Sequence, residues 1–113
     1  RVVEEMPRFV GCEGVDKKEI MECTQLKIQQ YMSKVDYPEI AIDNDLEGEL
    51  YVSFTVNEKG NVIDIDLINE LGNILDKTTI KHVKKMPKFA SAGKQRGKEV
   101  KVRYTVPVNY KLN

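Results

Sequence analysis

Few residues of this chain could do chemistry: two cysteines, one histidine and two neighbouring aspartates. Cys12 and Cys23 are separated by ten residues. That is neither a redox Cys-x-x-Cys spacing nor a zinc knuckle, and two thiols with one histidine make a poor metal site. In an exported domain, a disulfide between them would stabilise the fold by roughly 2–3 kcal/mol. In a cytosolic protein both would be reduced and half-buried, so the cysteines alone leave the two interpretations open.

The remaining candidates do not indicate catalysis. Nucleophilic catalysis needs a base within reach of a serine or cysteine, and the single histidine, His82, lies among lysines on the charged flank of a predicted helix, where we expect it to be solvated. Asp64 and Asp66 share one face of a predicted strand and could form a paired-carboxylate site, although such alternation is more typical of a wet outer face. The glycines match no phosphate loop. The sequence therefore predicts no enzyme, no cofactor and no metal.

The first regular element is an amphipathic helix. Asp16 followed by Glu19 has the spacing of a capping box and predicts its start. Apolar residues then recur at helical spacing, with Met21 and Met32 widening the stripe: Ile20, Thr24, Ile28, Tyr31 and Val35. Tyr37-Pro38 ends the helix, because the residue before a proline is pushed out of the α region. Pro38 suits the first position of a second, short helix that reaches about Asn44.

Two strands and another helix follow. Alternating apolar residues predict a half-buried strand over 50–56, and Asn57–Gly60 is a turn. The next strand alternates apolar residues facing inward with acidic residues facing outward: Ile63, Asp64, Ile65, Asp66 and Leu67. A helical stripe over 75–86 ends before Pro87, and we expect a polar loop over 93–97.

The final segment carries the longest alternation, in which every even-numbered residue is apolar: Val100, Val102, Tyr104, Val106, Val108, Tyr110 and Leu112. This predicts one strand of thirteen residues, well above the usual length of about 5–6. Pro107 lies inside it and cannot donate to a ladder, so we expect the strand to lie at an edge of the sheet or to be bulged there. An edge strand leaves unpaired backbone groups that can accept another chain. The predicted architecture is α+β: a three-stranded antiparallel sheet with helices packed on one face and a long C-terminal edge strand.

Length and charge set the outer limits. The 113 residues suffice for one globular domain with a modest core, no stretch reaches the roughly 18 apolar residues of a membrane span, and no signal peptide is visible. Because the chain begins at Arg1, we expect it to be a domain of a longer protein. Its formal net charge is zero, but residues 1–76 carry 7 basic and 17 acidic residues, whereas residues 77–113 carry 11 basic residues and one acidic. The favoured interpretation is internal pairing, with a basic final strand beside the acidic strand of Asp64 and Asp66.

The order and spacing of short motifs resemble the C-terminal domain of TonB, the periplasmic energy transducer of Gram-negative bacteria, in the version found in Bacteroidetes-type organisms. Each motif is weak alone, but the ordered set is fairly specific and spans nearly the whole chain: Phe9–Glu13, Tyr37–Ala41, Glu47–Phe54, Gly60–Val62, Leu75–Asp76, Met86–Phe89, Gly93–Gly97 and Tyr104–Leu112. The resemblance implies an irregular lead-in over 1–15 and a TonB C-terminal-like domain over 16–113.

The resemblance implies mechanical coupling rather than chemistry. A missing N-terminal segment would anchor the protein in the inner membrane and engage a proton-driven motor there. The periplasmic domain would bind the N-terminal peptide box of an outer-membrane transporter by adding it to the sheet as a strand. We expect this pairing before the proline of the final strand, at Val100, Lys101, Val102, Arg103, Tyr104 and Thr105. The family's Tyr-Pro segment also contacts the receptor, which carries over to Tyr37 and Pro38. A periplasmic location would favour the Cys12–Cys23 disulfide.

Two other functions remain open. TonB-like domains are also appended to signalling membrane peptidases and other envelope proteins, where the same fold would serve another partner. From a different class, a single-stranded nucleic-acid binder could use the basic C-terminal part, although the zero net charge argues against nucleic acid as a partner. The long edge strand also makes a strand-exchanged homodimer plausible.

Overall fold

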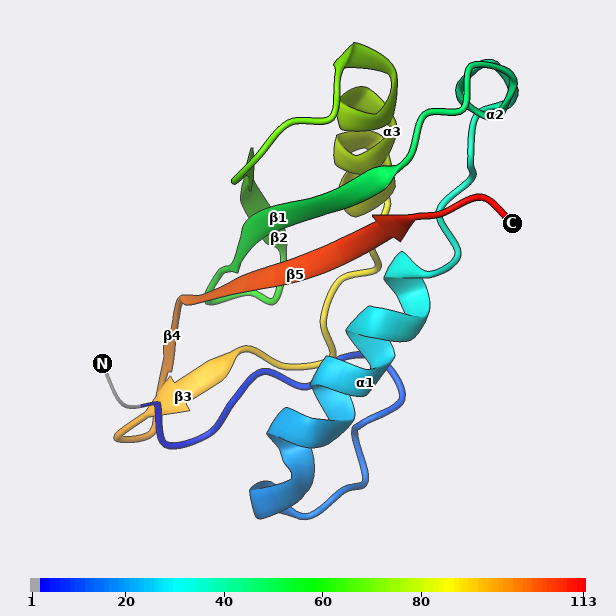
Figure 1. Cartoon of the computed structure of the whole chain (residues 1–113). Helices are drawn as coiled ribbons and strands as arrows, with labels where there is room; N and C mark the ends of the chain where they lie inside the picture. The colour runs from blue at the N-terminus through cyan, green and yellow to red at the C-terminus, as the bar shows by residue number, and fades with distance from the viewer. Residues whose placement is uncertain (1–2) are drawn as a thin grey trace.

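The computed structural model describes residues 3–113, so Arg1 and Val2, the first two residues of the expected lead-in, lie outside the described residues. The elements form an elongated domain of 50 × 23 × 20 Å (Figure 1). After a 3-10 turn over Lys17–Glu19 they are, in chain order, α1 (Ile20–Met32), α2 (Glu39–Asp43), β1 (Gly48–Val56), β2 (Val62–Leu67), α3 (Asn73–Lys84), β3 (Gly93–Gln95), β4 (Lys98–Val100) and β5 (Val102–Tyr110). In this described part of the chain, no helix has the length and apolar character needed to cross a membrane.

The central sheet has the order β2-β1-β5, and both pairings are antiparallel. β1 and β5 pair over nine residues, from Gly48 opposite Tyr110 to Val56 opposite Val102. The even-numbered side chains of both strands form one core with the buried faces of α1 and α3. The opposite face carries polar residues, where the Ser53 and Thr105 hydroxyls bond at 2.7 Å. The predicted α+β fold, with helices on one face and a long C-terminal edge strand, is confirmed.

The buried face of α1 follows the predicted helical period: Ile20, Thr24, Ile28 and Met32 are 0–2% exposed. Three details of the prediction are wrong. The helix ends at Met32, before Val35 and the predicted stop at Tyr37-Pro38. Met21 is half exposed and faces solvent. The capping box does not form, because Asp16 makes no side-chain cap and only its carbonyl accepts a hydrogen bond, from the Glu19 N–H, as the start of the 3-10 turn.

The expected lead-in contains no helix or strand among its described residues, but it is hydrogen-bonded to the segment over 90–94. Glu5 bridges Lys94 through two backbone hydrogen bonds, and Arg8 bridges Ser91. The lead-in therefore packs as a partner of the segment around β3 rather than as a free tail.

A bulge changes the inward face of β2. The register with β1 shifts by one residue between Ser53 and Thr55, and Asp64 adopts a φ of +51°. An aspartate tolerates this left-handed conformation better than most residues. The bulge adds one residue to β2, so side chains before and after it point to opposite faces from those that a regular alternation would give. As a result Ile65 packs against the core but Ile63 does not, so the predicted inward position of Ile63 is wrong.

The predicted thirteen-residue strand is two strands. β4 pairs with β3 in a hairpin, so the segment expected to be a loop over 93–97 is largely strand. Arg96 and Gly97 both take positive φ, which is the conformation of a two-residue hairpin turn. The ladder breaks at Lys101, and β5 begins at Val102. The apolar alternation continues through the break, which is why periodicity could not reveal it.

Candidate functional site

The outer edge of β5 carries backbone groups that point away from the sheet. Tyr51, on the neighbouring strand, shows which residues do so: its N–H donates to Asn69 Oδ1 and its carbonyl accepts from the Ile68 N–H, so both groups face β2. Since Tyr51 lies opposite Pro107, this is a non-hydrogen-bonded pair of β1 and β5, and the backbone of Pro107 faces outward. Every second residue of β5 is oriented in the same way: Arg103, Thr105, Pro107 and Asn109.

These outward groups have no protein partner within residues 3–113. Proline lacks an N–H, so Arg103, Thr105 and Asn109 supply the donors, and all four residues supply a carbonyl acceptor. This pattern fits an extended chain lying one strand spacing, about 4.8 Å, beyond β5.

The opposite edge of the sheet, at β2, is less suited to accept a strand. It is six residues long and interrupted by the bulge at Asp64, and bulges of this kind block edge-to-edge pairing. The Arg103 guanidinium also reaches across the open face and donates to the Asp64 carbonyl at 2.9 Å. Among the described residues, the uninterrupted edge of the central sheet is therefore that of β5.

Two of the six residues predicted to pair with a partner lie outside β5. Val100 belongs to β4 and pairs with Gly93, so its place in a single long edge strand is corrected. Lys101 lies in the break between β4 and β5 and is exposed. The local reason is the β3–β4 hairpin, which gives this end of the predicted strand a partner within the chain.

The other four predicted residues divide by orientation. Val102 and Tyr104 direct their backbone groups toward β1 and their side chains, 8% and 7% exposed, into the core. Arg103 and Thr105 direct their backbone groups outward and have exposed side chains. Asn109 has the same outward orientation, and the sequence prediction missed it because it placed the pairing before the proline.

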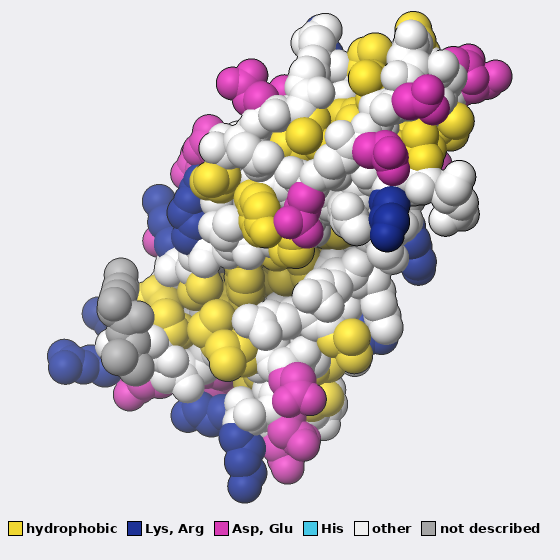
Figure 2. Space-filling view, in the orientation of Figure 1, with side chains coloured by type: hydrophobic (Ala, Val, Ile, Leu, Met, Phe, Trp, Pro, Cys, Tyr) yellow, Lys and Arg dark blue, Asp and Glu magenta, His cyan; other side chains and the backbone are white. Residues whose placement is uncertain are grey.

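A groove separates this edge from α1. Two depressions of about 230 and 270 Å³ share Gln29 and Pro107 and form what we call the edge groove. Figure 2 shows hydrophobic side chains in a hollow across the middle of this face. One depression is lined by Gln25, Ile28, Gln29, Tyr104, Thr105, Val106 and Pro107. The other is lined by Gln29, Met32, Ser33, Val35, Pro107, Val108 and Asn109.

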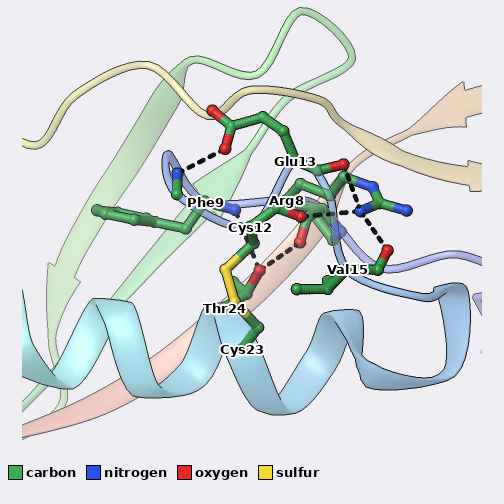
Figure 3. Close-up of a disulfide and its surroundings, with 9 residues drawn as sticks. Arg8, Phe9, Cys12, Glu13, Val15, Cys23 and Thr24 are labelled. Atoms are coloured by element: carbon green, nitrogen blue, oxygen red, sulfur yellow. Dashed lines mark hydrogen bonds between the residues drawn. A yellow bond between two sulfur atoms is a disulfide. The ribbon is translucent and has the colours of Figure 1, made fainter.

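The α1 wall of the groove is fixed to the lead-in by covalent and buried polar contacts (Figure 3). Cys12 and Cys23 form a disulfide with a Cα–Cα distance of 6.0 Å, within the range that a disulfide spans. Next to it, the fully buried Thr24 hydroxyl accepts from the Phe9 N–H at 3.1 Å and donates to the Pro7 carbonyl at 2.8 Å. These contacts tie the first half of α1 to residues 7–12.

Arg8 organises the turn that carries Cys12. Its Nη1 donates to the carbonyls of Cys12, Glu13 and Val15 at 2.8–3.0 Å, as Figure 3 shows. A guanidinium is always charged and presents several donors, so one side chain bonds to three carbonyls of this turn, of which that of Cys12 also accepts from the Val15 N–H. The position of α1 thus depends on the lead-in.

Tyr37 and Pro38 lie at the other end of β5. The Tyr37 ring packs edge-to-face on Tyr110, with ring centroids 5.3 Å apart, and its hydroxyl donates to the Leu46 carbonyl. The pKa of Tyr37 is raised by burial and by the nearby carboxylates of the 45–47 segment. Pro38 caps α2. Tyr110 and Arg103 are seven residues apart, about 23 Å along a strand, so the two predicted contact regions mark opposite ends of β5 rather than one pocket.

His82 is not the solvated residue that its charged neighbours suggested. Its ring stacks on Tyr31 with centroids 4.2 Å apart, and its Nε2 lies 2.8 Å from the Tyr31 carbonyl. The Tyr31 hydroxyl in turn donates to the His82 carbonyl at 2.6 Å. The helical period placed His82 on a flank of α3, but the end of α1 packs against that flank. His82 therefore joins two helices.

The predicted pairing of charges is also corrected. β1 lies between β5 and β2, so the basic strand is not beside the acidic one. Arg103 nevertheless spans β1 and reaches Asp66 at 3.0 Å, which is the one ion pair found in residues 3–113. Lys101 takes no part in an ion pair there. In the same described part of the chain, no group of three potential metal ligands occurs.

These features define a small α+β domain whose central sheet has, within residues 3–113, one long edge without a bulge, that of β5. Residues 33–112 match the family of Gram-negative bacterial TonB protein C-terminal domains. The chain belongs to this family, whose members are periplasmic protein-interaction domains rather than enzymes. The matched region begins after α1, so both cysteines and the α1 wall of the edge groove lie before it.

Two solved structures support the assignment. The chain is similar to the NMR solution structure of Helicobacter pylori TonB-CTD residues 179–285, with 30% identity over 89% of this chain and 87% of that chain and a TM-score of 0.60. It is also similar to the structure of residues 194–285 of the same protein, with 31% identity over 77% of this chain and 91% of that chain and a TM-score of 0.57. No curated protein sequence matches the chain significantly.

Proposed function

We propose that this domain binds the N-terminal peptide box of outer-membrane transporters by adding it as a fourth strand beside β5. In the full-length protein an N-terminal anchor in the inner membrane would connect the domain to a proton-driven motor, and the paired strand would carry the pull to the transporter. Tyr37 and Pro38 would contact the same receptor beyond the end of the strand. The domain itself catalyses no step.

The observation that carries this proposal is the outward backbone of Arg103, Thr105 and Asn109, which has no partner within residues 3–113, on a nine-residue edge strand. Main-chain hydrogen bonds supply affinity in strand addition, and side-chain pockets supply specificity. Pro107 removes one donor but keeps its acceptor, so we place the pairing chiefly on the Arg103–Thr105 side of it.

The sheet is suited to transmit force. β5 pairs with the central strand β1 over nine residues, and the buried side chains of both strands belong to the main core. A pull on a strand paired with β5 is therefore borne by the core of the domain rather than by a loop.

Amide hydrogen exchange on peptide binding tests the proposal. The probes are synthetic peptides that cover the N-termini of the outer-membrane transporters of the same organism. We expect the Arg103 and Thr105 amides to become protected at saturating peptide. The Val102 and Tyr104 amides, which face β1, serve as internal controls and should change little. Saturable binding that leaves the exchange of both Arg103 and Thr105 unchanged would refute the strand-addition mechanism.

The variant Pro107→Ala measures how far the added strand extends. It restores an outward N–H at an exposed position without altering the core. If the peptide pairs chiefly on the Arg103–Thr105 side, affinity should stay within about twofold of wild type. One further hydrogen bond would instead tighten binding by about 3–10-fold, and this result would move the pairing across residue 107.

A further inference from the structure

We propose that α1 selects the side chains of the bound strand, with Gln25 and Gln29 as specificity-determining residues for a polar side chain of the peptide. This inference rests on the proposed function, since it assumes that an extended peptide occupies the edge of β5. It adds a second wall: the peptide lies in the edge groove, paired with β5 on one side and flanked by α1 on the other.

Strand geometry determines which peptide side chains meet α1. Successive side chains of an added strand point to opposite faces of the sheet. On β5, Tyr104 and Val106 point into the helix-covered core, whereas Thr105 is exposed on the open face. Peptide side chains on the helix-covered face are therefore directed toward α1, and the alternate ones face solvent.

The residues that face this position combine apolar and polar groups. Ile28 is fully buried at the base of the α1 wall, and Gln25 and Gln29 are exposed on either side of it. Neither glutamine amide has a hydrogen-bond partner within the described residues. Each amide can donate and accept, so the pair suits a peptide side chain that does both, such as serine, threonine or asparagine.

Tyr104 lines the same depression with a side chain that is 7% exposed. Its hydroxyl is buried and has no hydrogen-bond partner within the described residues, so it does not itself reach the surface of the groove. A buried hydroxyl that is left unpaired costs free energy. A small rotation of the Tyr104 ring on peptide binding would let a polar peptide side chain bond to the hydroxyl and recover that cost.

The α1 wall lies outside residues 33–112, which the family model matches, although the longer Helicobacter pylori TonB-CTD structure covers 89% of this chain. The contacts that hold α1 in place, the Cys12–Cys23 disulfide and the Thr24 hydroxyl, also precede the matched residues. Selection by α1 is therefore expected to be a property of domains that share this N-terminal part, whereas backbone pairing with β5 needs only the matched region.

The test uses the tightest-binding transporter peptide of the exchange experiment, with each position replaced in turn by serine, alanine, leucine and glutamate. We expect one position to prefer serine over alanine and leucine. Gln29→Ala should remove that preference and weaken binding of the serine peptide by about 3–10-fold, the value of roughly one hydrogen bond. Gln25→Ala should act in the same direction. The matched control is Gln30→Ala, an exposed residue of α1 outside the groove lining, which should bind every peptide like wild type.

Two outcomes separate this inference from the proposed function. If Gln25→Ala and Gln29→Ala bind all peptides like wild type while Arg103 and Thr105 become protected, selection by α1 is refuted and strand addition stands. If no peptide protects these two amides, strand addition itself fails. Tyr104→Phe gives a further readout: we expect unchanged or higher thermal stability together with weaker binding of the serine peptide, and unchanged affinity would exclude a role for the hydroxyl.

Discussion

Thr24→Val should destabilise the domain more than Thr24→Ser, although valine fits the apolar environment better. Thr24 is fully buried, and its hydroxyl is the protein partner of the Phe9 N–H and the Pro7 carbonyl. Valine keeps the volume but leaves both backbone groups unpaired, each at a cost of about 1–2 kcal/mol. The expected loss is about 2–4 kcal/mol. Serine keeps both hydrogen bonds and loses one buried methyl, about 1 kcal/mol.

Thermal unfolding followed by circular dichroism measures this difference. With an unfolding entropy of about 2.1 cal/mol/K per residue, a loss of about 3 kcal/mol lowers Tm by about 13 °C in a domain of 113 residues. The serine variant should lose about 4 °C on the same scale. If the valine variant melts at or above the serine variant, packing rather than hydrogen bonding holds α1 to the lead-in, and the reasoning is wrong.

Three further predictions concern stability. Protein purified without reductant should contain no free thiol, and reduction of Cys12–Cys23 should cost roughly 3 kcal/mol in a urea titration; two free thiols at the outset would contradict the structure. Burial raises the pKa of Tyr104, so folding favours its protonated form, and the free energy of unfolding should fall as pH rises above the ordinary tyrosine pKa of about 10. Tyr104→Phe should make the free energy of unfolding less dependent on pH in this range, and an unchanged pH dependence would show that Tyr104 is not the group responsible. Asp66→Asn should cost less than about 1 kcal/mol in chemical unfolding, because its ion pair with Arg103 is exposed: 72% of the Asp66 side chain and 43% of the Arg103 side chain are accessible. A larger loss would show that Asp66 stabilises the fold by more than this ion pair.

Elements with one uninterrupted buried face could be predicted from the sequence. In α1 and α3 the fully buried positions, among them Ile28, Leu75 and Val83, follow the helical period that the apolar residues trace. β1 alternates from Leu50 to Phe54 and beyond, and it forms the centre of the sheet. In each case one face of the element is buried along its whole length, so its residues are apolar and their spacing reveals the type of element.

Elements shaped by a change of partner could not be predicted in this way. Lys101 interrupts the final ladder because β4 pairs with β3 instead of β1, yet the apolar residues on both sides keep the same parity. Asp64 turns β2 over through a bulge that no period reveals. His82 has lysine neighbours and packs on Tyr31 because a distant helix ends there. Each of these features depends on which segment lies opposite, and a local pattern carries no such information.

The charge asymmetry has a different meaning from the one that the sequence suggested. Internal neutralisation would require basic and acidic elements side by side, but β1 separates β5 from β2. Within residues 3–113 the two sets of charges meet in one ion pair, that of Arg103 and Asp66. The excess of basic residues after Asp76 therefore stays largely on the surface, where it is available to a partner, while Arg103 is already engaged on the open face of the sheet.

Part of the candidate site could have been predicted from one residue, Pro107. A proline in an edge strand is tolerated where its missing N–H would have faced outward, so Pro107 identifies both the edge and the parity of the outward backbone. Arg103, Thr105 and Asn109 share that parity and could have been selected from the sequence, whereas a continuous segment before the proline mixes outward residues with residues that bond to β1. The α1 wall had no such marker, because Gln25 and Gln29 are ordinary surface residues of a helix. They become candidates only when the disulfide and the buried Thr24 place that helix beside the edge of β5.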